Sequence, residues 1–116
     1  MMQAHGTLYL SNCAPLVTRA LDGTFTMTLR AVDRIDAMQM ESWRITWCGM
    51  AAESFWLANK GDLNTNQALQ VTLERVRSFT NGRFAAAEIH SQAVSIRIAP
   101  NKHDEHQRIL RAAVAA

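Results

Sequence analysis

Hydrophobic and polar residues alternate along much of this chain, with the period of two that is typical of half-buried β-strands. In the clearest run, residues 24–32, every second side chain is apolar: Phe25, Met27, Leu29 and Ala31. The residues between them are threonines and Arg30, so this strand has one apolar and one polar face. Similar alternation predicts strands over residues 6–12, 43–48, 69–74 and 88–98.

Other stretches depart from that period. Residues 50–60 carry apolar side chains three and four apart and predict a helix that Gly61 ends. Residues 102–116 predict a C-terminal helix by the same spacing. Past Glu74 the apolar phase slips to Val76, which indicates a β-bulge. Residues 33–41 show no clear pattern and are expected to form a loop.

Turn residues connect these elements. Asp22-Gly23 and Asn81-Gly82 both favour tight hairpins. The predicted order is therefore three strands, one helix, two strands and a terminal helix. An OB-fold has this layout, a partly open five-stranded barrel with one helix between strands 3 and 4. We expect an all-β OB-fold over residues 1–100 and a helix or tail over residues 101–116, although periodicity alone leaves other small barrels open.

Length and composition exclude several protein classes. The 116 residues suffice for one domain with its own core. No apolar run approaches the ~20 residues that a membrane helix needs. The N-terminal residues lack the basic and apolar segments of a signal peptide, so we expect a cytoplasmic protein in which Cys13 and Cys48 stay reduced and buried.

No arrangement of residues indicates an enzyme. Neither cysteine has a base beside it in the sequence, and the carboxylate pairs lie near no nucleophile or glycine-rich loop. His103 and His106 have helical spacing but lack a third ligand, so they make a poor metal site. We expect no cofactor, no metal and no catalytic residue.

The basic residues are unevenly distributed. The net charge is only +2, but residues 75–97 contain four arginines against Glu88 alone. All but two of the basic residues are arginine, which stacks on bases as well as pairing with phosphates. A GC-rich genome would produce the same bias. The charge therefore permits nucleic-acid binding without establishing it.

The segment 43–48 carries two tryptophans and an arginine. Trp43 and Trp47 share one face of an unbroken strand, with Arg44 on the other. Tryptophan and arginine on a small basic sheet suit stacking on unpaired nucleotide bases. All three are candidate nucleic-acid-binding residues. The alternative is that one or both indoles fill the core of the barrel.

A second cluster surrounds the predicted turn at Asn81-Gly82. It combines basic and aromatic side chains: Arg75, Arg77, Phe79, Arg83 and Phe84. OB-folds often bind ligands with this loop, so all five are candidate binding residues. The two phenylalanines could instead pack on each other or in a subunit interface. Arg30, on the polar face of its strand, is expected to follow the phosphate backbone unless it is a solvated surface charge.

Several fragments, in the right order, resemble the bacterial single-stranded DNA-binding protein family across roughly residues 5–98. The most specific is Trp43–Glu53, which is similar to that family's third strand and the start of its helix. Lys60-Gly61 resembles the end of the family helix, and residues 70–74 resemble its fourth strand. Residues 15–19 with Asp22-Gly23 are similar to its first connection.

The chain also departs from that family. Its tail ends in Arg111-Ala112-Ala113-Val114-Ala115-Ala116 and lacks the family's acidic tip. The short tail and Trp47-Cys48-x-Met50 are similar to the primosomal replication protein N group, although the helix predicted over residues 50–60 argues against that group. A relative carried by a plasmid, phage or integrative element would combine these features.

The resemblance implies a non-catalytic protein that binds single-stranded DNA in replication, recombination or repair. It also implies a homodimer or homotetramer, with the first strand and the terminal helix as candidate interfaces, and replication proteins as further partners. Two alternatives stay open. One is a protein–protein adaptor, primosome- or conjugation-like, with little strand binding. The other is an RNA-binding barrel.

Overall fold

The computed structural model describes residues 2–34, 40–79 and 88–99. Six strands, one α-helix and one 3-10 helix follow each other along the chain: β1 (Gln3–Leu10), β2 (Leu16–Arg19), β3 (Phe25–Arg34), β4 (Met40–Cys48), α1 (Met50–Asn59), η1 (Lys60–Asp62), β5 (Ala68–Phe79) and β6 (Glu88–Ile98). The mostly β architecture with a helix before β5 is as predicted. The predicted terminal helix lies outside the described residues.

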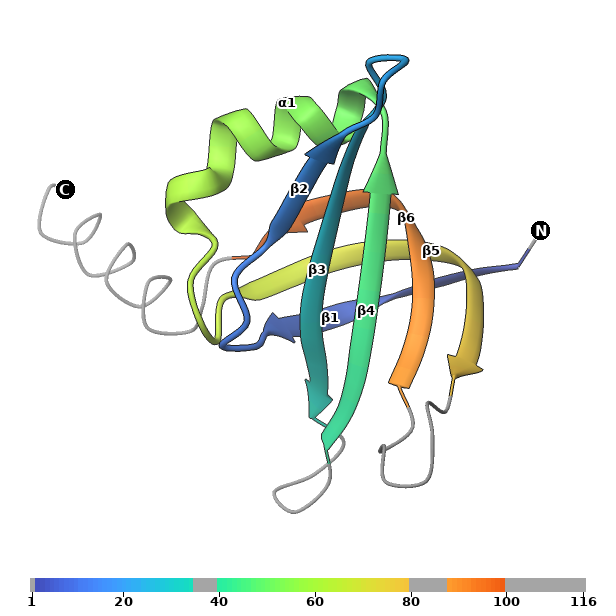
Figure 1. Ribbon diagram of the computed structural model, residues 1–116. Helices are drawn as coiled ribbons and strands as arrows, with labels where there is room; N and C mark the ends of the chain where they lie inside the picture. The colour runs from blue at the N-terminus through green and yellow to red at the C-terminus, as the bar shows by residue number, and fades with distance from the viewer. Residues whose placement is uncertain (1, 35–39, 80–87, 100–116) are drawn as a thin grey trace, which may run out of the picture.

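The strands form one strongly curved sheet in the order β1-β5-β6-β4-β3-β2 (Figure 1). An additional antiparallel pairing joins β1 to β3, so five strands close into a barrel and β2 lies outside the ring. The pairing between β4 and β6 is parallel, and the others are antiparallel. Closure pairs both sides of β3, whereas β2 pairs with β3 alone and leaves one short strand edge.

The strand β2 was not expected, because residues 15–19 were assigned to a connection. Its four residues pair with β3 from Leu16 opposite Thr28 to Arg19 opposite Phe25. The predicted Asp22-Gly23 turn joins these two strands, and Gly23 has the positive φ of 91° that such a turn favours. Hydrogen bonds from the backbone N–H and hydroxyl of Thr24 hold the pKa of the Asp22 carboxyl below its ordinary value.

The inner faces of the strands form the core. All four apolar residues predicted to face inward on β3 are buried: Phe25, Met27, Leu29 and Ala31. Side chains from the neighbouring strands complete the cluster, with Ile45, Leu69 and Leu73 almost fully enclosed. The alternation therefore predicted the faces of β3 correctly, because one face of each strand must leave water.

The helix α1 packs at one end of the barrel. Ala52 of this helix is fully buried, and Phe55 and Trp56 pack against the core, as predicted for Trp56. The chain passes from β4 to α1 at Gly49, whose φ of 103° and ψ of −170° suit glycine alone. Within the described residues, no helix has the length and apolar character needed to cross a membrane.

The predicted bulge in β5 is present. The pairing between β5 and β6 shifts between Glu74 and Arg77, and Arg75 has a positive φ of 52°. The prediction for the cysteines was half right: Cys13 and Cys48 are unpaired, but both are exposed. Cys13 lies in the connection before β2, and Cys48 is at the end of β4, where the alternation turns its side chain outward.

Candidate nucleic-acid interface

A row of basic residues crosses four neighbouring strands of the barrel. Arg30 of β3 is in register with Arg44 of β4. Arg44 is in register with His90 of β6, and His90 with Arg77 of β5. Adjacent strands lie roughly 4.8 Å apart, so these four positions follow one another across the outer surface at that spacing. We call Arg30, Arg44, His90 and Arg77 the basic row.

The strand alternation turns the row outward. Leu29 and Ile45, next to Arg30 and Arg44, are fully buried in the core, so the arginines point to the opposite face. The buried hydroxyl of Ser91 on β6 donates to the Arg44 carbonyl at 3.4 Å and adds a side-chain contact to the ladder between β4 and β6. Like charges directly opposite each other destabilise a sheet. An anion bound along the row would relieve that repulsion.

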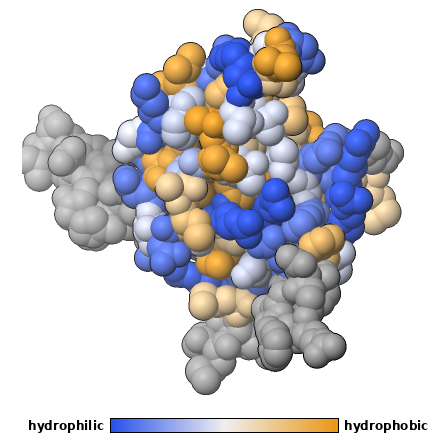
Figure 2. Space-filling model, viewed as in Figure 1, coloured by the Kyte–Doolittle hydropathy of each residue, from blue (hydrophilic) through white to orange (hydrophobic). Residues whose placement is uncertain are grey.

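A surface hollow of about 550 Å³ lies over β4, β5 and β6. It is lined almost entirely by polar and basic residues: Arg44, Thr46, Arg75, Val76, Arg77, His90, Ser91 and Gln92. In the space-filling view, hydrophilic side chains gather over the part of the surface that these strands form (Figure 2). No acidic residue of the described segments lines the hollow, which makes it suited to phosphate.

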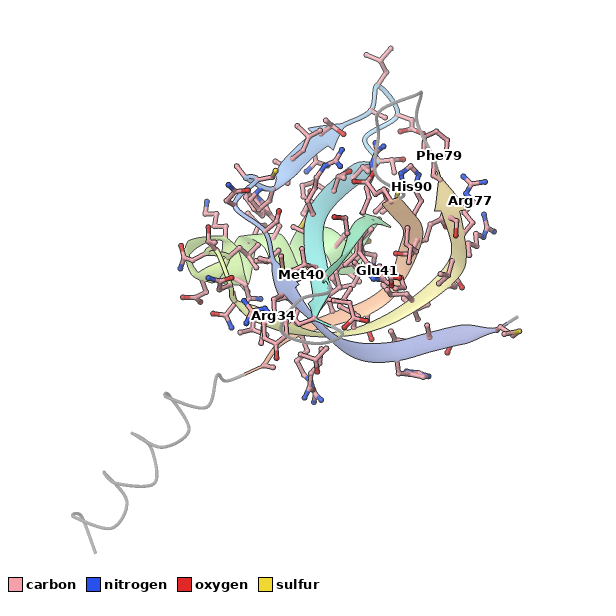
Figure 3. All side chains as sticks on the ribbon, turned by 90° about the horizontal axis from the view of Figure 1, so that it is seen from below. Arg34, Met40, Glu41, Arg77, Phe79 and His90 are labelled. Carbon is pink, nitrogen blue, oxygen red and sulfur yellow. The ribbon has the colours of Figure 1, made fainter. Side chains whose placement is uncertain are left out.

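An aromatic pair borders the basic row. The rings of Phe79 and His90 are stacked with centroids 4.7 Å apart and an angle of 17° between their planes. Figure 3 shows both side chains, with Arg77 beside them, at neighbouring ends of β5 and β6. Phe79 remains 46% exposed although it is large and apolar. An exposed ring next to cationic groups can stack on a nucleobase.

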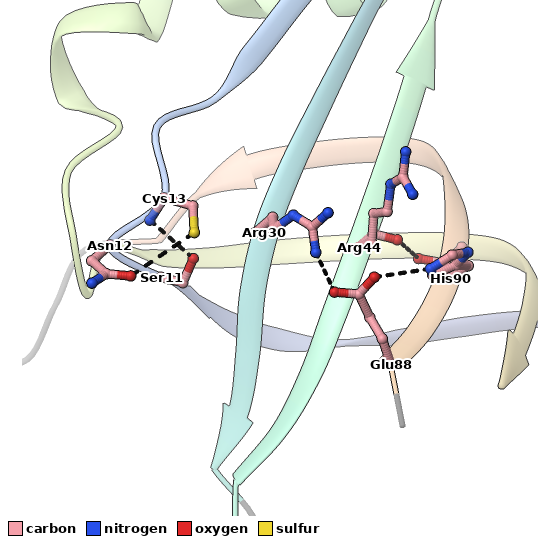
Figure 4. A network of polar contacts seen from close by, with 8 residues as sticks. Ser11, Asn12, Cys13, Arg30, Arg44, Glu88 and His90 are labelled. Carbon is pink, nitrogen blue, oxygen red and sulfur yellow. Dashed lines mark hydrogen bonds and ion pairs between the residues drawn. The ribbon is translucent and has the colours of Figure 1, made fainter. Parts of the chain in front are cut away.

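Glu88 is the acidic residue closest to the row along β6. It forms an ion pair with Arg30 and a hydrogen bond of 2.9 Å with Nε2 of His90 (Figure 4). The imidazole nitrogen can donate this hydrogen bond to the carboxylate oxygen. Glu88 thereby orients the His90 ring that stacks on Phe79. Within the described part of the chain, Arg44, Arg75 and Arg77 form no ion pair.

The structure places the two tryptophans of β4 on the inner face. Trp47 is only 8% exposed and packs on Phe55 with ring centroids 5.6 Å apart. Its burial conflicts with the stacking role expected of it. The strand runs without a bulge, so Trp47 points inward with Ile45.

Trp43 is half-buried against the same core. Its Nε1 donates to Glu41 at 3.1 Å, and the ring lines a cavity of about 180 Å³ between β1 and β5, away from the hollow. Trp43 therefore lies apart from the basic row, and a stacking role there does not fit its position.

The other predicted residues lie either around the basic row and the hollow or outside the described part of the chain. Arg30, Arg44, Arg75, Arg77 and Phe79 lie around the row and the hollow. Arg83 and Phe84 lie outside the described residues. His90 was missed, although its place on β6 could have indicated an outward side chain. What no sequence pattern showed is that β6 lies between β4 and β5.

The described residues contain no group of three or more histidine, cysteine, aspartate or glutamate side chains that could hold a metal ion. The site as described offers guanidinium groups, an imidazole and an exposed aromatic ring. These groups bind anions and planar rings. Of the potential reactive groups in the hollow, the Ser91 hydroxyl donates to the Arg44 carbonyl and Nε2 of His90 contacts Glu88.

Comparison with known proteins gives a clear result at the level of structure only. No protein-family model matches the chain, and no curated protein matches it. Among solved structures, the SSB domain of a Synechococcus protein superposes with a TM-score of 0.60 at 11% identity, over 84% of this chain and 94% of that one. The fold is that of bacterial single-stranded DNA-binding proteins.

Two further structures agree. The small single-stranded DNA-binding protein from Streptomyces coelicolor has a TM-score of 0.56 at 14% identity, over 84% of this chain and 94% of that one. The single-stranded DNA-binding protein from Thermus aquaticus has a TM-score of 0.57 at 15% identity, over 87% of this chain and 51% of that one. The resemblance to this family is thus confirmed in the fold, whereas the likeness to the primosomal group stays a prediction.

Proposed function

We propose that this protein binds single-stranded DNA on the outer face of β3, β4, β6 and β5, without catalysing a reaction. The observation that carries the proposal is the basic row, four side chains in register across four strands. The fold shared with single-stranded DNA-binding proteins supports it.

The row suits a strand that crosses the barrel at an angle to the β-strands. Arg44 and Arg77, with Arg75 beside them, would contact successive phosphates. Phe79, backed by His90, would stack on a base. Stacking accepts every base, so we expect little sequence preference. Such a protein would protect or organise unpaired strands during replication, recombination or repair.

A barrel of this kind covers only ~4–16 nucleotides. Two or four copies would hold a longer strand, so a homodimer or homotetramer is part of the proposal. The N-terminal half of β1 is polar and largely exposed and remains a candidate interface.

The proposal is tested by fluorescence anisotropy with a labelled oligo(dT) at low salt. We expect the wild-type protein to bind, and Arg77→Ala and Arg44→Ala each to weaken binding about 10-fold, because each loses a charge-assisted contact. Arg19→Ala is the matched control. Arg19 pairs with Glu53 at the other end of the barrel, so its loss should leave affinity nearly unchanged.

Three other results of this titration would each contradict part of the proposal. Absence of binding at low salt would favour the protein–protein adaptor. Tighter binding of an oligo(U) of equal length would assign the surface to RNA. Equal losses in all three arginine variants would show that general charge, and not the row, attracts the DNA.

A further inference from the structure

We infer that Glu88 is a built-in competitor of the DNA phosphates, an intramolecular anion that occupies Arg30 until a bound strand displaces it. The inference rests on the proposed function, because the competing ligand is the phosphate backbone. Glu88 would thereby lower the affinity for DNA, although its negative charge makes no favourable contact with phosphates.

Glu88 lies where it can compete with a phosphate. Its two carboxylate oxygens contact two different members of the basic row: one contacts Nη1 of Arg30 and the other Nε2 of His90. These two side chains come from β3 and β6, and β4 lies between those strands. Figure 4 shows the carboxylate reaching across β4 to Arg30. A phosphate needs the same guanidinium donors, in the same geometry, that a carboxylate takes.

The ion pair between Arg30 and Glu88 is partly exposed to water. The side chain of Arg30 is 44% exposed and that of Glu88 is 23% exposed. An ion pair this accessible to water contributes only modestly to stability, so a phosphate can displace the carboxylate. A deeply buried pair would not exchange in this way.

The arginines of the basic row differ in whether they have an acidic partner. In the described part of the chain, Arg44 and Arg77 are free of acidic partners, whereas Arg30 at the end of the row is paired. The row therefore has two arginines available at once and a third that becomes available only when Glu88 moves. DNA that spans the whole row gains less binding free energy at Arg30, because its phosphate replaces the existing contact with Glu88.

The variant that tests this is Glu88→Gln. Glutamine keeps the side-chain length and an oxygen that can accept from His90, so the stack with Phe79 is retained, but the charge that holds Arg30 is lost. We expect Glu88→Gln to bind oligo(dT) about 5-fold more tightly than wild type at low salt. The slope of log affinity against log salt should stay close to that of wild type, because Arg30 contacts a phosphate in both complexes and only the competing carboxylate is removed.

The matched control is Glu53→Gln. Glu53 also pairs with an arginine, Arg19, but on α1 and away from the row. Glu53→Gln removes the same charge and the same kind of pair, but away from the row, and we therefore expect it to change the affinity much less. The double variant Arg30→Ala/Glu88→Gln isolates the mechanism: measured against Arg30→Ala, it should show little gain. Circular dichroism and thermal unfolding of all variants confirm that they are folded.

The outcomes separate this inference from the proposed function. Equal gains in Glu88→Gln and Glu53→Gln, or a full gain without Arg30, would overturn the role of Glu88 and leave DNA binding intact. Binding by Glu88→Gln alone, with a silent wild type, would show that DNA does not displace the carboxylate and would overturn the exchange inferred for Arg30. Absence of binding in both proteins would overturn the inference and the proposed function together.

Discussion

Trp47 shows how one residue decides between two interpretations of the same sequence. The indole was a candidate for base stacking because Arg44 lies nearby on the same strand. In the structure it contacts Phe55 within the core, and Arg44 is on the opposite face. The aromatic surface available to a ligand is instead Phe79, which stacks on a histidine that the sequence did not single out.

We therefore predict that Trp47→Ala acts on stability. Removal of a buried tryptophan costs about 3–5 kcal/mol of unfolding free energy, because transfer energy is lost and a cavity remains. Urea unfolding measures this loss, with Leu57→Ala, an exposed residue of α1, as a control of small effect. The milder Trp47→Phe should keep the affinity for oligo(dT). A variant that is fully stable but no longer binds would restore the stacking role.

At the level of elements, alternation located most strands and failed where a strand was short or irregular. The strand β6 begins and ends at the predicted residues, Glu88 and Ile98, and the bulge after Glu74 was visible as a slip in phase. β2 has only four residues, and none of them is buried, so its pattern was too weak to read. β3 and β4 extend into the segment 33–41 assigned to a loop, because pairing with each other stabilises residues of weak pattern.

The junction between β4 and α1 gives the prediction that belongs to this scale. Gly49→Ala should lower the unfolding free energy by about 1–3 kcal/mol. The φ and ψ angles at Gly49 lie in a region that residues with a Cβ rarely adopt. No atom lies within 4 Å of the position that a Cβ would take, so the cost comes from the backbone and not from a clash.

Gly61→Ala is the matched control for that substitution. Its added Cβ would also meet open space, and its backbone does not have a positive φ. Thermal or urea unfolding of the two variants should therefore differ. Equal stabilities would show that the junction tolerates a side chain and that Gly49 is not required for the turn into α1.

At the level of the whole molecule, the small net charge conceals a strongly basic surface. Acidic residues pair away from the hollow, as Glu53 does with Arg19, or at its border, as Glu88 does. Three arginines in one hollow can attract a polyanion although the chain carries a net charge of only +2.

The salt dependence of binding should reflect these three arginines together with Arg30, which contacts DNA once Glu88 is displaced. With about 0.7 per phosphate on a single strand, the slope of log affinity against log salt should be about −3. Arg77→Ala should reduce its magnitude by about 0.7, whereas Phe79→Ala should weaken binding and leave the slope unchanged, because stacking displaces no counterion. Anisotropy titrations over a range of sodium chloride concentrations measure both. A slope near zero would mean that the row does not contact phosphates.

The sequence by itself predicted which residues face inward on β3, the position of the helix to within one residue, and a small barrel as the fold. These properties follow from local periods and turn residues, which depend on near neighbours in the chain. Only the tertiary structure decided which strands lie side by side. Because β6 lies between β4 and β5, residues 30, 44, 77 and 90 form one row. Register between distant segments comes from the packing of the closed barrel as a whole, and no single segment carries that information.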